Sequence, residues 1–204
     1  LFETTGELQW LEEARSLTAT MIEEFWDDEE GGFFYTGRSH EDLIVRSKDF
    51  FDNATPAGNS VAAELLLRIG LLTDNSDYQR RAATILRLMA STVQRYPSGF
   101  GRLLCALDFY LATPKEIAII GDPATAEMRL LIDQVWKTYL PNKIVAQTSP
   151  EDVAALELVP LLRNRPLLDN KATAYVCERF TCNKPVTSAA DLASQLMSGA
   201  ATTG

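Results

Sequence analysis

The spacing of apolar residues changes at Pro114, and this change limits the fold more than any other feature of the sequence. Four segments before it carry apolar residues three and four positions apart, as on one face of an α-helix: 7–25, 61–72, 78–96 and 102–111. After it, short apolar runs typical of buried strands alternate with helical segments. We therefore predict a mainly α protein: a helical-hairpin part over 1–113, a small α/β part packed on it over 114–197, and a frayed tail over 198–204.

The α/β part has the pattern of a small parallel or mixed sheet flanked by helices. Strands are predicted over 116–120, 143–148 and 172–177, and helices over 124–139, from 150 toward 162, and from 188 to 197. Gly121 and Pro123 follow the first strand, but the segment lacks the glycine pattern of a phosphate-binding loop, and Pro123 has no backbone N–H. We therefore predict a tight turn there.

Charge, apolar runs and cysteine content narrow the class of protein. A net charge of −9 with no basic block argues against nucleic acid and anionic membranes as partners, and no apolar run reaches the roughly 18 residues of a membrane span. Three cysteines do not make a disulfide framework, so we expect a reducing, cytoplasmic compartment. The chain begins at Leu1, and we interpret the chain as a piece of a longer protein.

A polar loop, Lys48–Ser60 (KDFFDNATPAGNS), lies between two predicted helices. Pro56 disfavours helix before it, Gly58 permits a positive φ, and Asn59 or Ser60 is a suitable N-cap for a helix starting at Val61. One interpretation is therefore a loop that exists only to start the next helix.

The loop geometry does not need the side chains of Asp49, Asp52 and Asn53. Carboxylates and amides beside aromatic rings are typical of a cleft that binds sugars. Glycosidases use two carboxylates about 5 to 10 Å apart, and Asp49 and Asp52 are the candidate catalytic pair. A structural loop and a site lining both stay open.

A second cluster precedes this loop. Gly31 and Gly32 allow a tight reversal, and the aromatic residues beside them either seal the core or stack against a sugar. The candidate substrate-binding residues are aromatic or carry polar groups suited to hydroxyls: Trp26, Asp27, Phe33, Tyr35, Asn53 and Asn59. Asp27 would join the acidic pair if the two loops met.

Cys177 and Cys182 have four residues between them, against two in a thioredoxin-type pair or a zinc knuckle. Three interpretations are open: reduced structural thiols, a redox-sensitive pair, and metal ligands together with Cys105 and His40. Nothing in the spacing brings a four-ligand set together, so we expect neither a metal nor a cofactor.

Four strings of residues occur in a fixed order: Phe25-Trp26-Asp27-x-x-x-Gly31-Gly32-Phe33-Phe34, Arg46-x-Lys48-Asp49, Asp52-x-Ala54-Thr55-Pro56-x-Gly58-Asn59-Ser60 and Ala174-Tyr175-Val176-Cys177-x-x-x-x-Cys182-x-x-Pro185-Val186. Together they resemble the C-terminal region of the spermatogenesis-associated protein 20 family, whose bacterial members are described as thioredoxin-domain-containing. Ala57 stands where the pattern has serine.

The resemblance implies an N-terminal thioredoxin-like domain, outside this sequence, and an α/α toroid similar to N-acylglucosamine 2-epimerases and six-hairpin glycosidases. A toroid needs about a dozen helices, so the four strong helices before Pro114 would be its closing part. The epimerases use two histidines as acid and base, and this chain has only His40, in a polar turn.

Two functional hypotheses follow, and the sequence leaves open whether the protein is an enzyme. The first is a domain that binds or converts a small carbohydrate by epimerase- or glycosidase-like chemistry. The second is a non-catalytic scaffold or client-binding domain that works with the missing N-terminal part of its own chain. Self-association through exposed apolar helix faces is also expected.

Overall fold

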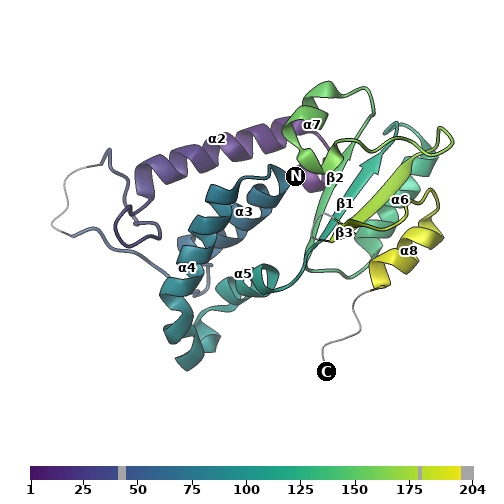
Figure 1. Ribbon diagram of the computed structural model, residues 1–204. Helices are drawn as coiled ribbons and strands as arrows, with labels where there is room; N and C mark the ends of the chain where they lie inside the picture. Colours follow the sequence, from purple (N-terminus) through teal and green to yellow (C-terminus); the bar gives the residue numbers. More distant parts are fainter. Residues whose placement is uncertain (41–44, 179–180, 199–204) are drawn as a thin grey trace. The chain divides into compact units, whose positions relative to one another are not determined.

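The computed structural model describes residues 1–40, 45–178 and 181–198 (Figure 1). The chain divides into two compact units: a helical unit, Trp10–Ala112, and an α/β unit, Leu1–Gln9 with Thr113–Gly204. The predicted helical part included residues 1–9, which the structure groups with the α/β unit. Of the predicted tail, only Ser198 is among the described residues.

The helical unit contains α2 (Leu8–Phe25) from Trp10 onward, α3 (Gly58–Leu72), α4 (Ser76–Arg95) and α5 (Gly101–Leu111), with a 3₁₀ turn, η1 (Pro97–Gly99), before α5. The central helix is α3, which packs against both α4 and α5. Most of its apolar residues are buried, with Ala63 and Leu66 fully enclosed, whereas Val61 at its start is 42% exposed. Asn75 caps α4, because its side-chain oxygen accepts the N–H groups of Asp77 and Tyr78.

The start of α3 differs from the prediction. The helix begins at Gly58 and not at Val61, so Asn59 and Ser60 lie inside its first turn and neither is the N-cap. Ala57 holds the N-cap position without a side-chain hydrogen bond, and Gly58 does not have a positive φ. Asp52, five positions earlier, accepts the N–H of Ala57 and so fixes the residue that precedes the helix.

The α/β unit contains a four-stranded mixed sheet in the order β2-β1-β3-β4. Its strands are β1 (Lys115–Ile120), β2 (Lys143–Thr148), β3 (Thr173–Glu178) and β4 (Thr181–Cys182). β1 is parallel to β2 and antiparallel to β3, which in turn is antiparallel to β4. The parallel pair requires a crossover, and α6 (Ala126–Lys137) supplies it.

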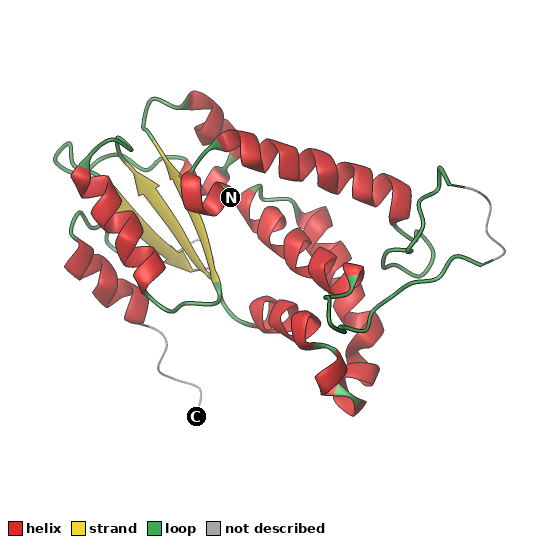
Figure 2. Cartoon of the chain, turned by 180° about the vertical axis from the view of Figure 1, so that it is seen from behind, coloured by secondary structure: helices red, strands yellow, loops and turns green. Residues whose placement is uncertain are grey.

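Helices cover the sheet. α6 and α8 (Ala189–Met197) lie side by side and contact β1 and β3 (Figures 1 and 2). They enclose a core around Ile117, Ile119, Leu131 and Leu192. The remaining elements are α1 (Phe2–Thr5) against β2, α7 (Val153–Leu158), and the 3₁₀ turn η2 (Pro160–Leu162) against β1 and β2.

The mainly helical class with an α/β part is therefore confirmed, and a toroid is not shown. In the part of the chain that the structure describes, no helix is both long and apolar enough to cross a membrane. The turn predicted after the first strand is present, and at Gly121 a Cβ would lie 2.8 Å from the Cβ of Ala172.

Candidate functional site

The two loops predicted to form a site lie in the helical unit, at 26–35 and 45–57. In the first, Gly31 and Gly32 have φ of +81° and +80°, so the chain reverses tightly as expected. The reversal pairs Trp26 with Phe33 in an isolated bridge, and their rings meet edge to face with centroids 5.0 Å apart. Phe33 is buried.

Asn59 joins the two loops. Its Oδ1 accepts the N–H of Phe33 at 2.7 Å, and its Nδ2 donates to the carbonyl oxygens of Phe33 and Asp49, each at 2.9 Å. The side chain is buried, and both of its N–H donors are used. Asn59 was predicted to bind substrate. In the structure its amide forms hydrogen bonds to backbone groups of the two loops.

Asp52, a candidate catalytic residue, is bonded on both oxygens. Oδ1 accepts the N–H of Ala57 at 2.9 Å, while Oδ2 accepts the N–H groups of Arg102 and Leu103 at 2.8 and 3.1 Å. Phe100 at the N-cap of α5 makes no side-chain cap bond. Asp52 therefore caps α5 from 50 residues away, with its negative charge at the favourable end of the helix dipole.

Asp49 and Asn53, the other two residues whose side chains the loop geometry does not need, are exposed. Asp49 Oδ1 accepts the N–H of Phe51 at 3.1 Å, the pattern of an Asx turn, and Asn53 Nδ2 is 3.5 Å from the carbonyl oxygen of Phe51. Neither side chain lines the cleft described next.

An open cleft of about 680 Å³ lies beside the 26–35 loop. Its lining is largely ionic, with three basic and four acidic residues and two aromatic ones: Trp26, Asp27, Asp28, Glu29, Glu30, Phe34, Arg38, Arg46 and Lys48. Of the predicted substrate-binding aromatics, only Trp26 lines it. Tyr35 is 77% exposed and lies outside this lining.

Asp27 and Lys48 form the most enclosed ion pair of this cleft. Lys48 Nζ lies 2.5 Å from Asp27 Oδ2 and also donates to the carbonyl oxygen of Gly31. The side chain of Asp27 is only 11% exposed, and that of Lys48 is 13% exposed. The Lys48 hydrogen bond, aided by backbone N–H groups of Glu29 and Glu30, lowers the pKa of Asp27 below its ordinary value, against the opposing effect of burial.

The other two basic residues hold the cleft wall together. Arg38 donates to the carbonyl oxygen of Trp26 at 2.8 Å and pairs with Asp28, while Arg46 lies over the ring of Phe34, 4.2 Å from its centroid. Sequence reasoning did not single out these residues, although Arg46 and Lys48 stand in one of the four strings. The available signal was the string Arg46-x-Lys48-Asp49, in which two basic residues lie two positions apart and the second directly precedes an aspartate.

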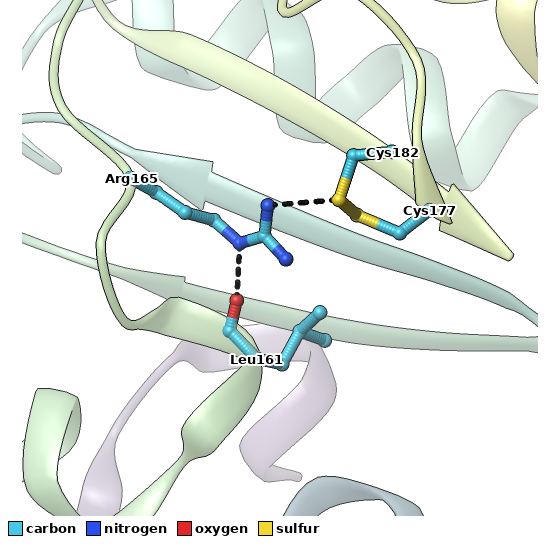
Figure 3. Close-up of a disulfide and its surroundings, with 4 residues drawn as sticks. All are labelled: Leu161, Arg165, Cys177 and Cys182. Carbon is cyan, nitrogen blue, oxygen red and sulfur yellow. Dashed lines mark hydrogen bonds between the residues drawn. A yellow bond between two sulfur atoms is a disulfide. The ribbon is translucent and has the colours of Figure 1, made fainter. Parts of the chain in front are cut away.

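Cys177 and Cys182 are joined by a disulfide that links β3 to β4 (Figure 3). They are direct partners in the antiparallel pair, with Cα atoms 3.9 Å apart. Cys177 is buried and Cys182 is exposed. The interpretation as reduced thiols does not fit this state. Reversibility of the bond, which the redox interpretation requires, stays a prediction.

Arg165 contacts this disulfide. Its Nη1 is 3.2 Å from the sulfur of Cys182, and its Nε donates to the carbonyl oxygen of Leu161 (Figure 3). No local signal in the sequence connects Arg165 with a cysteine 17 positions later. Among residues 1–40, 45–178 and 181–198, no group of three or more histidine, cysteine or acidic side chains is arranged to hold a metal ion, and His40 is exposed.

Fold and loops thus define a mainly helical protein with an α/β part, in which candidate site residues connect two loops of the helical unit.

No family model matches the chain. Spermatogenesis-associated protein 20 of Homo sapiens is 34% identical over 195 residues, 94% of this chain and 25% of the relative, and the Rattus norvegicus protein is 33% identical over the same length. An uncharacterized protein of Caenorhabditis elegans is 24% identical over 188 residues.

The chain is therefore homologous to part of spermatogenesis-associated protein 20, and these relatives support the family that the four strings predicted. It spans about a quarter of the length of the curated relatives it matches.

Proposed function

We propose that the helical unit is a non-catalytic scaffold that binds a client, and that the loops 26–35 and 45–57 act as its internal struts. The observation that carries this proposal is the bonding of Asp52. A general acid, base or nucleophile must direct an oxygen at its substrate. Both oxygens of Asp52 are instead directed at backbone N–H groups of the segments that begin α3 and α5.

Asn59 supports the same proposal from the other loop. Its amide is buried and bonds the backbone of both Phe33 and Asp49, so it holds the two loops together and has no donor left for a hydroxyl of a ligand. The residues that looked like a sugar site in sequence are, on this proposal, the residues that fix the loop backbone.

The scaffold works with the rest of a longer protein. We propose that α2–α5 belong to an α/α toroid, and that it presents a client to the N-terminal thioredoxin-like domain that the resemblance implies, in the cytoplasm. A structure of a longer relative tests the toroid: α2–α5 would lie among about a dozen helices arranged as hairpins. An isolated four-helix arrangement there would contradict it.

Exposed apolar side chains support self-association. Leu17 of α2, Leu88 of α4 and Leu111 of α5 are 68%, 40% and 71% exposed. Where exposed apolar side chains form a contiguous patch, that patch is commonly a surface on which another molecule packs. We expect light scattering to show a mass above that of the monomer as concentration rises, and a clean monomer at high concentration would contradict this.

Replacement of Asp52 tests the scaffold proposal. Asp52→Ala removes three backbone hydrogen bonds and should lower the free energy of unfolding by about 1 to 3 kcal/mol, measured by urea denaturation. The matched control is Asp49→Ala, which removes one exposed bond and should change stability by about 0.5 kcal/mol or less. If Asp52 were catalytic, its replacement would instead leave stability unchanged or raise it, because functional residues are often kept at a cost in stability.

Sugar binding is the second candidate, and the cleft beside Trp26 favours it. Its lining combines the aromatic residues Trp26 and Phe34 with charged groups such as Arg38, a combination that sugar-binding sites use. Calorimetric titration with neutral and acidic monosaccharides tests it. Binding that is lost in Arg38→Gln and kept in Arg163→Gln, far along the chain, would support this candidate, and no heat at millimolar sugar would reject it.

A further inference from the structure

We propose that the Cys177–Cys182 disulfide is a reversible site of thiol–disulfide exchange, in which Cys182 reacts with an external thiol, Arg165 stabilises its thiolate, and Cys177 is the resolving thiol. The external reactant is a small thiol or dithiol. The inference concerns the α/β unit alone and goes beyond the proposed scaffold function.

The two sulfurs occupy unequal positions. Cys177 is in β3, between β1 and β4, and only 1% of the residue is exposed. Cys182 ends the two-residue strand β4 at the edge of the sheet and is exposed. An incoming thiolate must approach a sulfur directly, so Cys182 is the one that it can attack. Burial protects Cys177 until the bond has opened.

Arg165 is held in place by its surroundings. Its Nε donates to the carbonyl oxygen of Leu161, and its guanidinium lies over the ring of Tyr175, 5.1 Å from the centroid. The hydroxyl of Tyr175 in turn donates to the carbonyl oxygen of Pro166. These contacts leave Nη1 directed at the sulfur of Cys182, 3.2 Å away (Figure 3). A fixed cation at this distance favours a thiolate over a thiol.

Nearby charges only partly offset the desolvation of Arg165. Burial disfavours the charged guanidinium and lowers the pKa of Arg165, while the nearby groups Tyr175 and Glu116 act in the opposite direction. Of the carboxylates on the neighbouring strands, Glu178 pairs with Lys115 at 3.1 Å. A thiolate on Cys182 would add a negative charge next to a partly buried cation and so offset its desolvation.

The reaction balances as two displacements. In the first, the thiolate of a dithiol attacks Cys182 and forms a mixed disulfide, the Cys177–Cys182 bond breaks, and Cys177 leaves as a thiolate that takes a proton. In the second, the other thiolate of the dithiol attacks the dithiol sulfur that is bound to Cys182. A disulfide forms within the dithiol, and Cys182 is released as a thiolate beside Arg165. The dithiol is oxidised by two electrons and the cysteine pair is reduced; the reverse steps oxidise it.

The first experiment measures thiol reactivity in the reduced chain. The chain is reduced, treated with iodoacetamide at pH 6.5, and the alkylation of each cysteine is followed by peptide mass spectrometry. Cys105 is exposed and serves as an internal reference. We expect Cys182 to react about tenfold faster than Cys105, because a nearby cation raises its thiolate fraction, and Cys177 to react slowest.

Arginine variants separate the charge effect from exposure. Arg165→Gln should bring the rate at Cys182 down to that at Cys105, while Arg165→Lys keeps most of the acceleration. The matched control is Arg163→Gln, since Arg163 belongs to the same segment and donates to the carbonyl oxygens of Leu156 and Glu157. Equal rates at Cys182 and Cys105 in the unchanged chain, or no effect of Arg165→Gln, would overturn the role of Arg165.

The second experiment locates the exchanging sulfur. The oxidised chain is incubated with glutathione and quenched with acid, and the adduct is located by mass spectrometry. We expect glutathione on Cys182 and recovery of the disulfide when oxidised glutathione replaces the reduced form. Glutathione mainly on Cys177 would show that Cys182 is not the sulfur attacked, and reduction that occurs only in denaturant would show a purely structural disulfide; either result would overturn the proposal.

Discussion

The polar loops of the helical unit and the Arg165–Cys182 pair of the α/β unit use their polar groups in opposite ways. In the loops, Asp52 and Asn59 direct side-chain atoms at backbone groups. In the α/β unit, backbone and ring contacts instead hold Arg165 so that its guanidinium is directed at a sulfur. A cluster of polar residues in sequence therefore says less about chemistry than the direction of each side chain.

The largest effect should come from Asn59→Ala. This change removes two buried hydrogen bonds to the backbone of Phe33 and a partly buried one to the carbonyl oxygen of Asp49. We expect the free energy of unfolding to fall by about 2 to 4 kcal/mol in urea denaturation. Asn53→Ala is the control, with an expected change below about 0.5 kcal/mol. Equal effects of the two changes would mean that the loop is not a strut.

A smaller loss is expected from Lys48→Met. It leaves the carboxylate of Asp27 without its cation although the side chain is only 11% exposed. The expected cost is about 1 to 3 kcal/mol, and the double variant Asp27→Asn/Lys48→Met should recover part of it, because no unpaired charge remains. Additive losses in this cycle would show that the pair is not coupled.

Reduction of the disulfide should cost about 2 kcal/mol or less, because the cysteines close a loop of only a few residues. The sheet should stay folded, since Cys177 remains paired with β1 through Glu116. Far-ultraviolet circular dichroism with and without a reductant measures this. Loss of the sheet signal on reduction would assign the bond a structural role and remove the contrast with the loops.

The acid dependence of stability should be the smallest effect. Lys48 lowers the pKa of Asp27 in the folded state below its ordinary value of 3.8. The ion pair therefore contributes fully above that value, and its contribution is lost as the pH falls through the lowered folded-state pKa. Denaturation curves of the unchanged chain and Asp27→Asn should converge toward acid pH; parallel curves down to pH 2 would contradict this.

The fold class could be predicted from the sequence because the apolar spacing changes at Pro114 and both patterns are strong. The first residues could not be placed in the same way. Glu3 accepts the N–H of Val145 in β2, a contact across 142 positions that no local pattern encodes. The start of α3 was missed because the residue before the helix, Ala57, offers no side-chain cap, and its own N–H is bonded by Asp52.

The candidate residues were partly found, and their partners were not. Asp27 was identified from its place beside Trp26, but its cation, Lys48, is 21 positions away. A redox-sensitive pair was one of three interpretations of Cys177 and Cys182, while Arg165 depends on the packing of the segment after η2 against β3. Local sequence indicates which groups are available, and tertiary structure decides which of them meet.

Amide hydrogen exchange tests the central claim most directly. If Asp52 is a strut, the N–H groups of Arg102 and Leu103 should be protected from exchange in the unchanged chain, and Asp52→Ala should accelerate their exchange while residues deep in α4, such as Ile85, keep theirs. Unprotected Arg102 and Leu103 in the unchanged chain would mean that the carboxylate of Asp52 is free, and the scaffold proposal would be wrong.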